Sequence, residues 1–167
     1  MAKLNLIKGF TDYTRAVFIS RLMRKPLAAM KARVDDLIAQ KDEKESLRYV
    51  LYSAHDDQVS NMLTFLKKDD IYFTVPYAST VMFELHYDED CLETKADESC
   101  FSVHMTHNGV PFSFDSCTAN SQLEEGDDVT DCTYTEFLAY LDPLFIKDDL
   151  DAICLQPFTP PSRKFLV

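Results

Sequence analysis

The chain has 167 residues, enough for one domain that buries about two thirds of its unfolded surface. Hydrophobic residues make up 46% and aromatic residues 12%, a composition that excludes a disordered protein. The 28 acidic and 17 basic residues give a net charge of −11, which argues against nucleic acid or an anionic membrane as partner. Only three glycines occur and no glycine-rich phosphate loop is present. No apolar run reaches the roughly 18 residues of a membrane span.

The first third of the chain predicts helices and one strand. Apolar spacing indicates a helix over residues 10–24 and a second helix from Pro26, whose ring suits a first helical turn, through residue 38. The charged residues 41–46 read as a surface turn. An apolar run over residues 47–54 predicts a strand that leads into His55, and apolar residues three and four apart predict a helix over residues 57–67.

The second half predicts a β-hairpin and a last helix. Alternating and β-branched residues indicate strands over residues 78–87, 100–106 and 110–114, and Asn108-Gly109 predicts the hairpin turn between the last two. Thr133 and Glu136 have the spacing of a capping box at the start of a helix over residues 133–144. Three prolines mark residues 156–167 as an irregular tail. Together these elements predict an α/β protein.

All five cysteines lie in the second half of the chain. Cys91 and Cys100 bracket one polar connection and Cys117 and Cys132 bracket another, a placement typical of extracellular disulfides. The odd count makes Cys154 the expected unpaired cysteine. No C-x₂-C spacing exists, so a zinc site is the less favoured alternative and we expect no metal. The first residues lack the apolar core of a secretion signal, which leads to the expectation that an N-terminal part is missing.

The strongest candidate site is the pair His55-Asp56, which follows the predicted strand at the start of a helix. The first turn of a helix offers free N–H groups to an anion, and an imidazole beside a carboxyl group suits phosphate or proton chemistry. The alternative is structural: Asp56 or Asp57 caps the helix and His55 is a surface residue. The other histidines, which we expect to be surface or half-buried strand residues, are His86, His104 and His107.

Read together, these motifs resemble the C-terminal half of the histidine acid phosphatases. The resemblance covers about residues 27–155 and is most specific at 49–56, which ends Tyr-Ser-Ala-His-Asp, and at 76–85, which runs from Pro-Tyr-Ala-Ser to Phe-Glu-Leu. The family implies phosphomonoester hydrolysis through a phosphohistidine, without a cofactor. By position, His55 would bind the phosphate and Asp56 would act as the general acid that protonates the leaving alcohol. A protonated acid would favour activity at low pH.

The chain departs from the family pattern at decisive positions. The family's nucleophile lies in an N-terminal Arg-His-Gly segment, which is absent here, and no histidine precedes His55. Asp57 adds a carboxyl group where relatives more often have an uncharged residue. Thr80 replaces a cysteine of the vertebrate enzymes, and Cys91 and Cys100 have no vertebrate counterpart. Cys154 resembles a family cysteine whose partner belongs to the N-terminal half.

The resemblance implies that residues 1–167 are a single partial domain, the C-terminal portion of a three-layer fold with helices flanking a mostly parallel sheet and an added hairpin. We expect the isolated chain to be inactive and its partners to be a phosphomonoester substrate and either the N-terminal half or a partner chain that covers the exposed sheet. The alternative is a non-catalytic, degenerate phosphatase fold that serves as a structural or interaction subunit. The cysteines and the resemblance indicate a secreted, lysosomal or other lumenal location.

Overall fold

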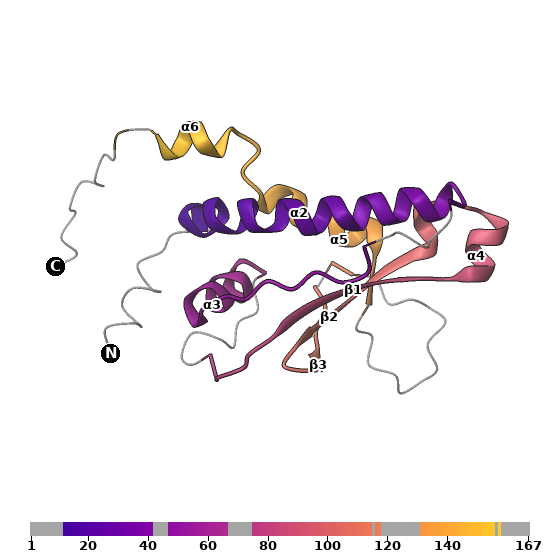
Figure 1. Cartoon of the computed structure of the whole chain (residues 1–167), viewed down its shortest axis with the longest axis horizontal. Helices are drawn as coiled ribbons and strands as arrows, with labels where there is room; N and C mark the ends of the chain where they lie inside the picture. Colours follow the sequence, from indigo (N-terminus) through magenta and orange to yellow (C-terminus); the bar gives the residue numbers. More distant parts are fainter. Residues whose placement is uncertain are drawn as a thin grey trace.

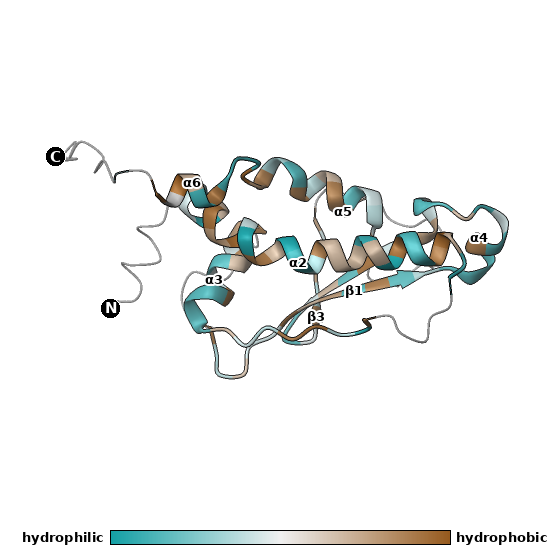
Figure 2. Cartoon of the chain, turned by 45° about the horizontal axis from the view of Figure 1, so that its top comes forward, coloured by the Kyte–Doolittle hydropathy of each residue, from teal (hydrophilic) through white to brown (hydrophobic). Residues whose placement is uncertain are grey.

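The structure is a computed structural model that describes residues 12–41, 47–66, 75–114, 116–117, 131–155 and 157. A long helix, α2 (Asp12–Ile38), lies along a small antiparallel sheet, with α5 (Tyr134–Leu141) beside it (Figures 1 and 2). The shorter helices are α3 (Asp56–Phe65), α4 (Glu89–Thr94) and α6 (Leu150–Cys154), and two 3₁₀ turns are η3 (Glu98–Cys100) and η4 (Asp142–Leu144). The predicted mixture of helices and strands is confirmed.

The sheet is built around β2 (Phe101–His107), which pairs with β1 (Val81–Tyr87), β3 (Val110–Pro111) and β4 (Asp131–Thr133). Each of these pairings is antiparallel, so the mostly parallel sheet predicted from the sequence is not found among the described strands. The two-residue turn between β2 and β3 allows only the antiparallel direction, because parallel strands need a crossover of a dozen or more residues. The longer link between β1 and β2 contains α4 and η3.

The hairpin turn predicted at Asn108-Gly109 is confirmed. Both residues have positive φ angles, 53° and 76°, as a type I′ turn requires. Glycine reaches this region without strain, and asparagine tolerates it better than most residues. The turn fixes the register that pairs Thr106 with Pro111 and His107 with Val110.

One face of the sheet carries the core. Phe101, Val103 and Met105 of β2 are at most 2% exposed and belong to the same buried cluster as residues of α2 and α5. Phe137 of α5 lies with its ring centroid 5.9 Å from that of Phe83 on β1. On the opposite side of β1, Glu84 and its neighbours of the same parity are exposed. Among the described residues, helices therefore cover one face of the sheet.

The sequence predicted two helices where the structure has one. α2 continues through Pro26, which was expected to begin a second helix. Proline removes one backbone hydrogen bond, but the helix on either side buries side chains such as Met23 and Val34 in the core. That burial along both halves outweighs the lost bond, so the helix does not end at the proline.

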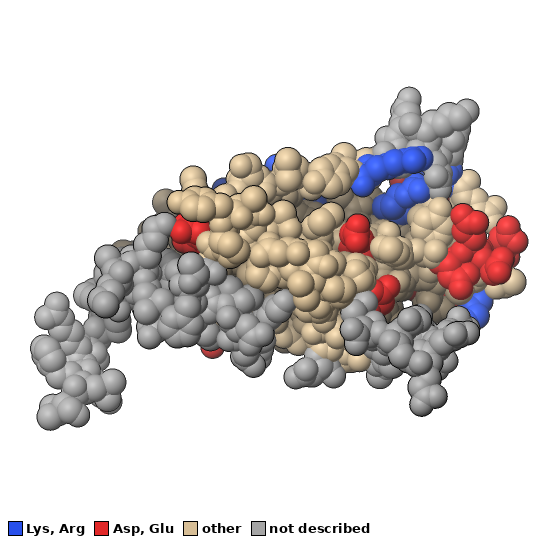
Figure 3. Space-filling view, turned by 90° about the horizontal axis from the view of Figure 1, so that it is seen from below, with Lys and Arg blue, Asp and Glu red and all other residues tan. Residues whose placement is uncertain are grey.

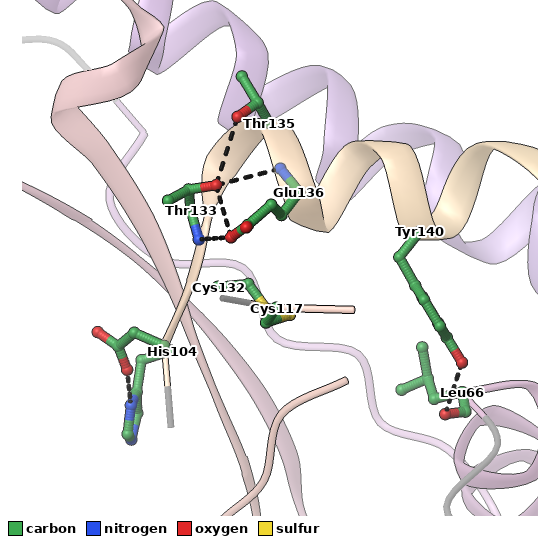
Figure 4. Close-up of a disulfide and its surroundings, with 9 residues drawn as sticks. Leu66, His104, Cys117, Cys132, Thr133, Thr135, Glu136 and Tyr140 are labelled. Carbon is green, nitrogen blue, oxygen red and sulfur yellow. Dashed lines mark hydrogen bonds and ion pairs between the residues drawn. A yellow bond between two sulfur atoms is a disulfide. The ribbon is translucent and has the colours of Figure 1, made fainter. Parts of the chain in front are cut away.

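The last helix begins as predicted. Thr133 Oγ1 accepts a hydrogen bond from the Glu136 N–H at 3.3 Å, and the Thr133 N–H donates to Glu136 Oε2 at 3.1 Å (Figure 4). This is a complete capping box. The helix ends at Leu141, and the residues predicted to extend it form the 3₁₀ turn η4. The sequence did not predict α4, α6 or β4.

The structure pairs Cys91 with Cys100 and Cys117 with Cys132, at Cα–Cα distances of 5.4 and 4.9 Å. The first disulfide joins α4 to the residue that precedes β2. The second holds β4 to the segment after β3 (Figure 4). The predicted disulfide pattern is thus confirmed for these four cysteines. The side chain of Cys154 and, apart from Pro157, the predicted tail 156–167 lie outside the described residues.

Candidate functional site

His55 and Asp56 lie at the start of α3, as the sequence predicted. His55 is the N-cap residue, with an extended backbone at φ −97° and ψ 168°. Its carbonyl accepts hydrogen bonds from the N–H groups of Gln58 and Val59, both at 3.1 Å. Its imidazole makes no capping bond and His55 is exposed. The backbone of His55 therefore starts the helix, while its ring remains available for a ligand.

The two carboxylates after His55 contact the first turn of the helix. Asp56 Oδ1 accepts a hydrogen bond from the Asp57 N–H at 3.1 Å, and Asp57 Oδ1 accepts one from the Gln58 N–H at 2.8 Å. Acidic side chains in this position are stabilised by the positive end of the helix dipole. Both aspartates therefore stabilise the first turn of α3, although the N-cap residue is His55 and neither aspartate. Both are also exposed beside His55.

The segment that leads into this site was predicted as a strand, and the structure corrects that prediction. Residues 47–54 are not assigned to any strand, and the described sheet consists of β1 to β4 alone. Figure 1 shows the segment as an elongated trace that runs from the end of α2 to α3. Its large apolar side chains are exposed: Leu47, Tyr49, Val50, Leu51 and Tyr52. The run contains the apolar residues on which the prediction was based, but none of the described strands pairs with it.

This arrangement offers one imidazole, two carboxyl groups and a helix N-terminus. An imidazole can donate a hydrogen bond to a phosphate oxygen, and a protonated carboxyl group can give a proton to a leaving oxygen. A nucleophile and a cationic cradle for the phosphate are also needed for phosphoryl transfer. The three remaining histidines of the chain lie on β1 and β2, within the sheet. The site therefore contains part of the groups that the chemistry requires.

A second polar cluster lies on the sheet. His104 Nδ1 is 2.5 Å from Asp131 Oδ1, with side chains 22% and 32% exposed (Figure 4). The ring centroid of His86 lies 6.0 Å from that of His104. His104 is thus a half-buried strand residue, as expected, but its pairing with Asp131 was not predicted. The pairing depends on β4, which places Asp131 directly opposite His104 in the register.

Ser79 and His107 form a contact that resembles a catalytic pair. Ser79 Oγ lies 3.1 Å from His107 Nε2 and donates to Asn108 Oδ1, also at 3.1 Å. A hydroxyl group has one proton, so in this network Nε2 carries the proton that it shares with Ser79. A general base would instead take the serine proton. Thr80 donates its N–H to the same Asn108 oxygen at 2.8 Å, so the group fastens the loop before β1 to the hairpin tip.

Shifted pKa values are found at Tyr134, Asp97, Lys31 and Lys41. Burial raises the pKa of Tyr134, and the charge of Glu98 adds to the shift. Hydrogen bonds from Ser99 lower the pKa of Asp97. Ion pairing with Asp35 and Asp36 raises the pKa values of Lys31 and Lys41, respectively. These shifts arise from structural contacts.

Two other kinds of site were sought in the described part of the chain. No three of its His, Cys, Asp and Glu side chains are placed to hold a metal ion together. A small cavity of about 140 Å³ lies beside α2 and is lined by Ser20, Arg24, Leu27, Phe145 and Ile146. None of these is a candidate site residue. Within the described residues, every helix is too short or too polar to form a bilayer span.

Comparisons with protein-family models, with curated proteins and with solved structures find no match to this chain. The family expectation therefore rests on the motifs at residues 49–56 and 76–85 and on the geometry of the site at α3.

Proposed function

We propose that this chain supplies part of the active site of a phosphomonoester hydrolase of the histidine acid phosphatase type. His55 binds the phosphate of the substrate, and Asp56 protonates the leaving oxygen. The observation that carries the proposal is the presentation of His55 at the N-terminus of α3, exposed and with its ring not used to cap the helix. An imidazole next to a carboxyl group at a helix N-terminus is an arrangement suited to a phosphate monoester.

The groups of the α3 site explain why we expect the isolated chain to be inactive. Asp56 and Asp57 add negative charge beside an anionic substrate, and no nucleophilic histidine precedes His55 in the sequence. Positive groups that stabilise the transferring phosphoryl group usually make the largest catalytic contribution. We propose that an N-terminal half or a partner chain provides both the nucleophile and these cations. It would also complete a three-layer fold around a sheet that is open on one face here.

The two disulfides fit a compartment in which cysteines oxidise, so we place the protein in the secretory or lysosomal lumen. An acidic compartment would keep the general acid protonated.

A specific observation favours a second candidate function. Both Asp56 and Asp57 accept hydrogen bonds from backbone N–H groups in the first turn of α3, so both carboxylates are used by the helix start. In a degenerate phosphatase fold that acts as an interaction subunit, the two carboxylates would only stabilise the start of α3 and would take no part in catalysis. The two functions differ in what Asp56 does to catalysis.

The test is a comparison of leaving groups in the intact protein that contains this chain. Asp56→Asn is expected to reduce hydrolysis of an alkyl phosphate by about 10²- to 10⁴-fold, because an alkoxide needs a proton to depart. Hydrolysis of p-nitrophenyl phosphate should fall much less, because p-nitrophenolate leaves without help. The matched control is Asp57→Asn, which removes the neighbouring carboxylate from the same helical turn. Equal losses on both substrates, or equal losses in both variants, would refute the role of Asp56.

A further inference from the structure

The small cavity beside α2 combines an apolar lining with two polar side chains. Its apolar part is formed by three half-buried residues, Leu27 of α2 and Phe145 and Ile146 of the segment that follows η4. Its polar part is formed by Ser20 and Arg24, which lie four residues apart and therefore on one face of α2. The volume of about 140 Å³ is close to the roughly 150 Å³ of an apolar cavity that holds one benzene molecule. The cavity therefore has room for a ligand with about six carbon atoms.

Ser20 places a buried hydrogen-bond donor in the cavity. The residue is 1% exposed, and its Oγ accepts a hydrogen bond from the Ile146 N–H at 3.0 Å. A serine hydroxyl group also has one proton to donate, and no acceptor for that proton is found among the described residues. A buried donor without an acceptor is costly, so the hydroxyl group favours a ligand that brings an oxygen into the cavity.

Arg24 adds a positive charge where the cavity opens to solvent. It lines the cavity and is itself exposed, and within the described part of the chain it forms no ion pair. The neighbouring Arg21 differs, because it pairs with Asp151 at 3.2 Å. A guanidinium group binds the two oxygens of a carboxylate in a planar, directional way. Since Ser20 lies one helical turn away on the same face, both side chains can bind one carboxylate.

The acidic residues of the protein leave this preference in place. Of the four aspartates at residues 142–151, two form ion pairs and one caps α6, which leaves Asp148 exposed. Other acidic side chains gather at the α4 end of the molecule (Figure 3), which Figure 1 places beyond the C-terminal end of α2. Arg24 lies about 20 Å along the helix from that end. Charges at that distance are largely screened at physiological salt.

We infer that this cavity binds a small monocarboxylate whose apolar body has about six carbon atoms. The carboxylate lies between the Ser20 hydroxyl group and the Arg24 guanidinium group. The apolar body lies against Leu27, Phe145 and Ile146. A singly charged head group matches the single cation better than a doubly charged phosphate does. None of these residues belongs to the α3 site, so the inference does not depend on the proposed function.

The first test is a titration of the intact protein that contains this chain with hexanoate, followed by NMR through the methyl groups of Leu27 and Ile146. Hexanamide is the matched ligand, because it has the same shape without the charge. We expect saturable shifts with a dissociation constant on the order of 1 mM for hexanoate, and about fivefold weaker binding of hexanamide. Shifts that do not saturate, or equal affinities for the two ligands, would overturn the inference.

The second test removes the charge from the protein. Arg24→Gln should abolish the preference for hexanoate over hexanamide, because the amide and the carboxylate then meet the same neutral side chain. The matched control is Lys25→Gln, at the neighbouring exposed cation, which does not line the cavity and should keep the preference. Both positions are exposed, so neither change disturbs the core. A preference that survives Arg24→Gln, or that Lys25→Gln also removes, would refute the assignment of the carboxylate to Arg24.

The third test measures the length of the ligand that the cavity accepts. Affinity should rise by at least about tenfold from propanoate to hexanoate, because three more methylene groups are buried. It should then stay level for decanoate, since the volume is already filled. Affinity that continues to rise through decanoate would indicate general binding to apolar surface and would contradict a site of this size.

Discussion

The hydroxyl group of Tyr134 provides the sharpest stability prediction. The Tyr134 side chain is 0% exposed, and its Oη makes no hydrogen bond within the described residues. A buried polar group without a partner costs about 1–3 kcal/mol relative to its hydrated state. Phenylalanine has the same ring without that group. We therefore expect Tyr134→Phe to raise the free energy of unfolding by about 1 kcal/mol, the lower end of that range.

Tyr140 supplies a matched control from the same helix. Its hydroxyl group donates to the carbonyl of Leu66 at 3.4 Å and so links α5 to the C-terminal end of α3 (Figure 4). Tyr140→Phe should lower the free energy of unfolding by about 0.5–1.5 kcal/mol, the value of one such hydrogen bond. The same chemical change thus has opposite expected signs at two positions of α5. Urea unfolding monitored by circular dichroism measures both.

The pH dependence gives a second readout of the same residue. Burial and the charge of Glu98 raise the pKa of Tyr134 above its ordinary value of 10.0. The unfolded chain then loses this proton at a lower pH than the folded chain, so stability decreases as the pH rises above about 10. Tyr134→Phe removes that part of the decrease. A Tyr134→Phe variant that is less stable at neutral pH by 1 kcal/mol or more would mean that the hydroxyl has a partner, and would refute the reasoning.

Three further predictions concern local contacts. Thr133→Ala removes the capping bond that Thr133 Oγ1 accepts from the Glu136 N–H and should cost about 1 kcal/mol in urea unfolding. An unchanged midpoint would mean that this bond does not stabilise α5. Replacing Cys117 and Cys132 by serine opens a loop with a sequence separation of 15 and should cost about 3 kcal/mol, and a loss below about 1 kcal/mol would show that the loop is fixed without the disulfide. Hydrogen bonds from Ser99 lower the pKa of Asp97, so they stabilise the fold above the ordinary value of 3.8 and this stability is lost as the pH falls through the folded-state pKa. Asp97→Asn should therefore flatten the acid side of a melting-temperature profile, and an unaltered acid side would contradict this.

Local signals predicted the elements that depend on neighbouring residues. The spacing of Thr133 and Glu136, the Asn108-Gly109 turn and the apolar period of α3 each specify a backbone geometry within a few residues, and the structure has all three. The start of α3 was also predicted within one residue, which placed His55 and Asp56 correctly.

The elements that the sequence did not reveal depend on distant contacts. β4 has three residues and exists because it pairs with β2, from which it is separated by a long connection. Its register with His104 could not be predicted, and so neither could the contact with Asp131. The continuation of α2 through Pro26 likewise depends on tertiary packing, which overrides the local cost of proline. The strand predicted at residues 47–54 is wrong for a third reason. A strand forms only when it pairs with a neighbouring strand, and none of the described strands pairs with this segment.

The central claim is that His55 is a phosphate ligand while the other three histidines are structural. The most direct measurement is a titration of the intact protein that contains this chain with inorganic phosphate, followed through the ring resonances of the four histidines of this chain at constant pH and ionic strength. The account predicts saturable shifts of the His55 ring and no comparable shifts for His86, His104 or His107. Equal small shifts of all four rings, or none at His55, would contradict it.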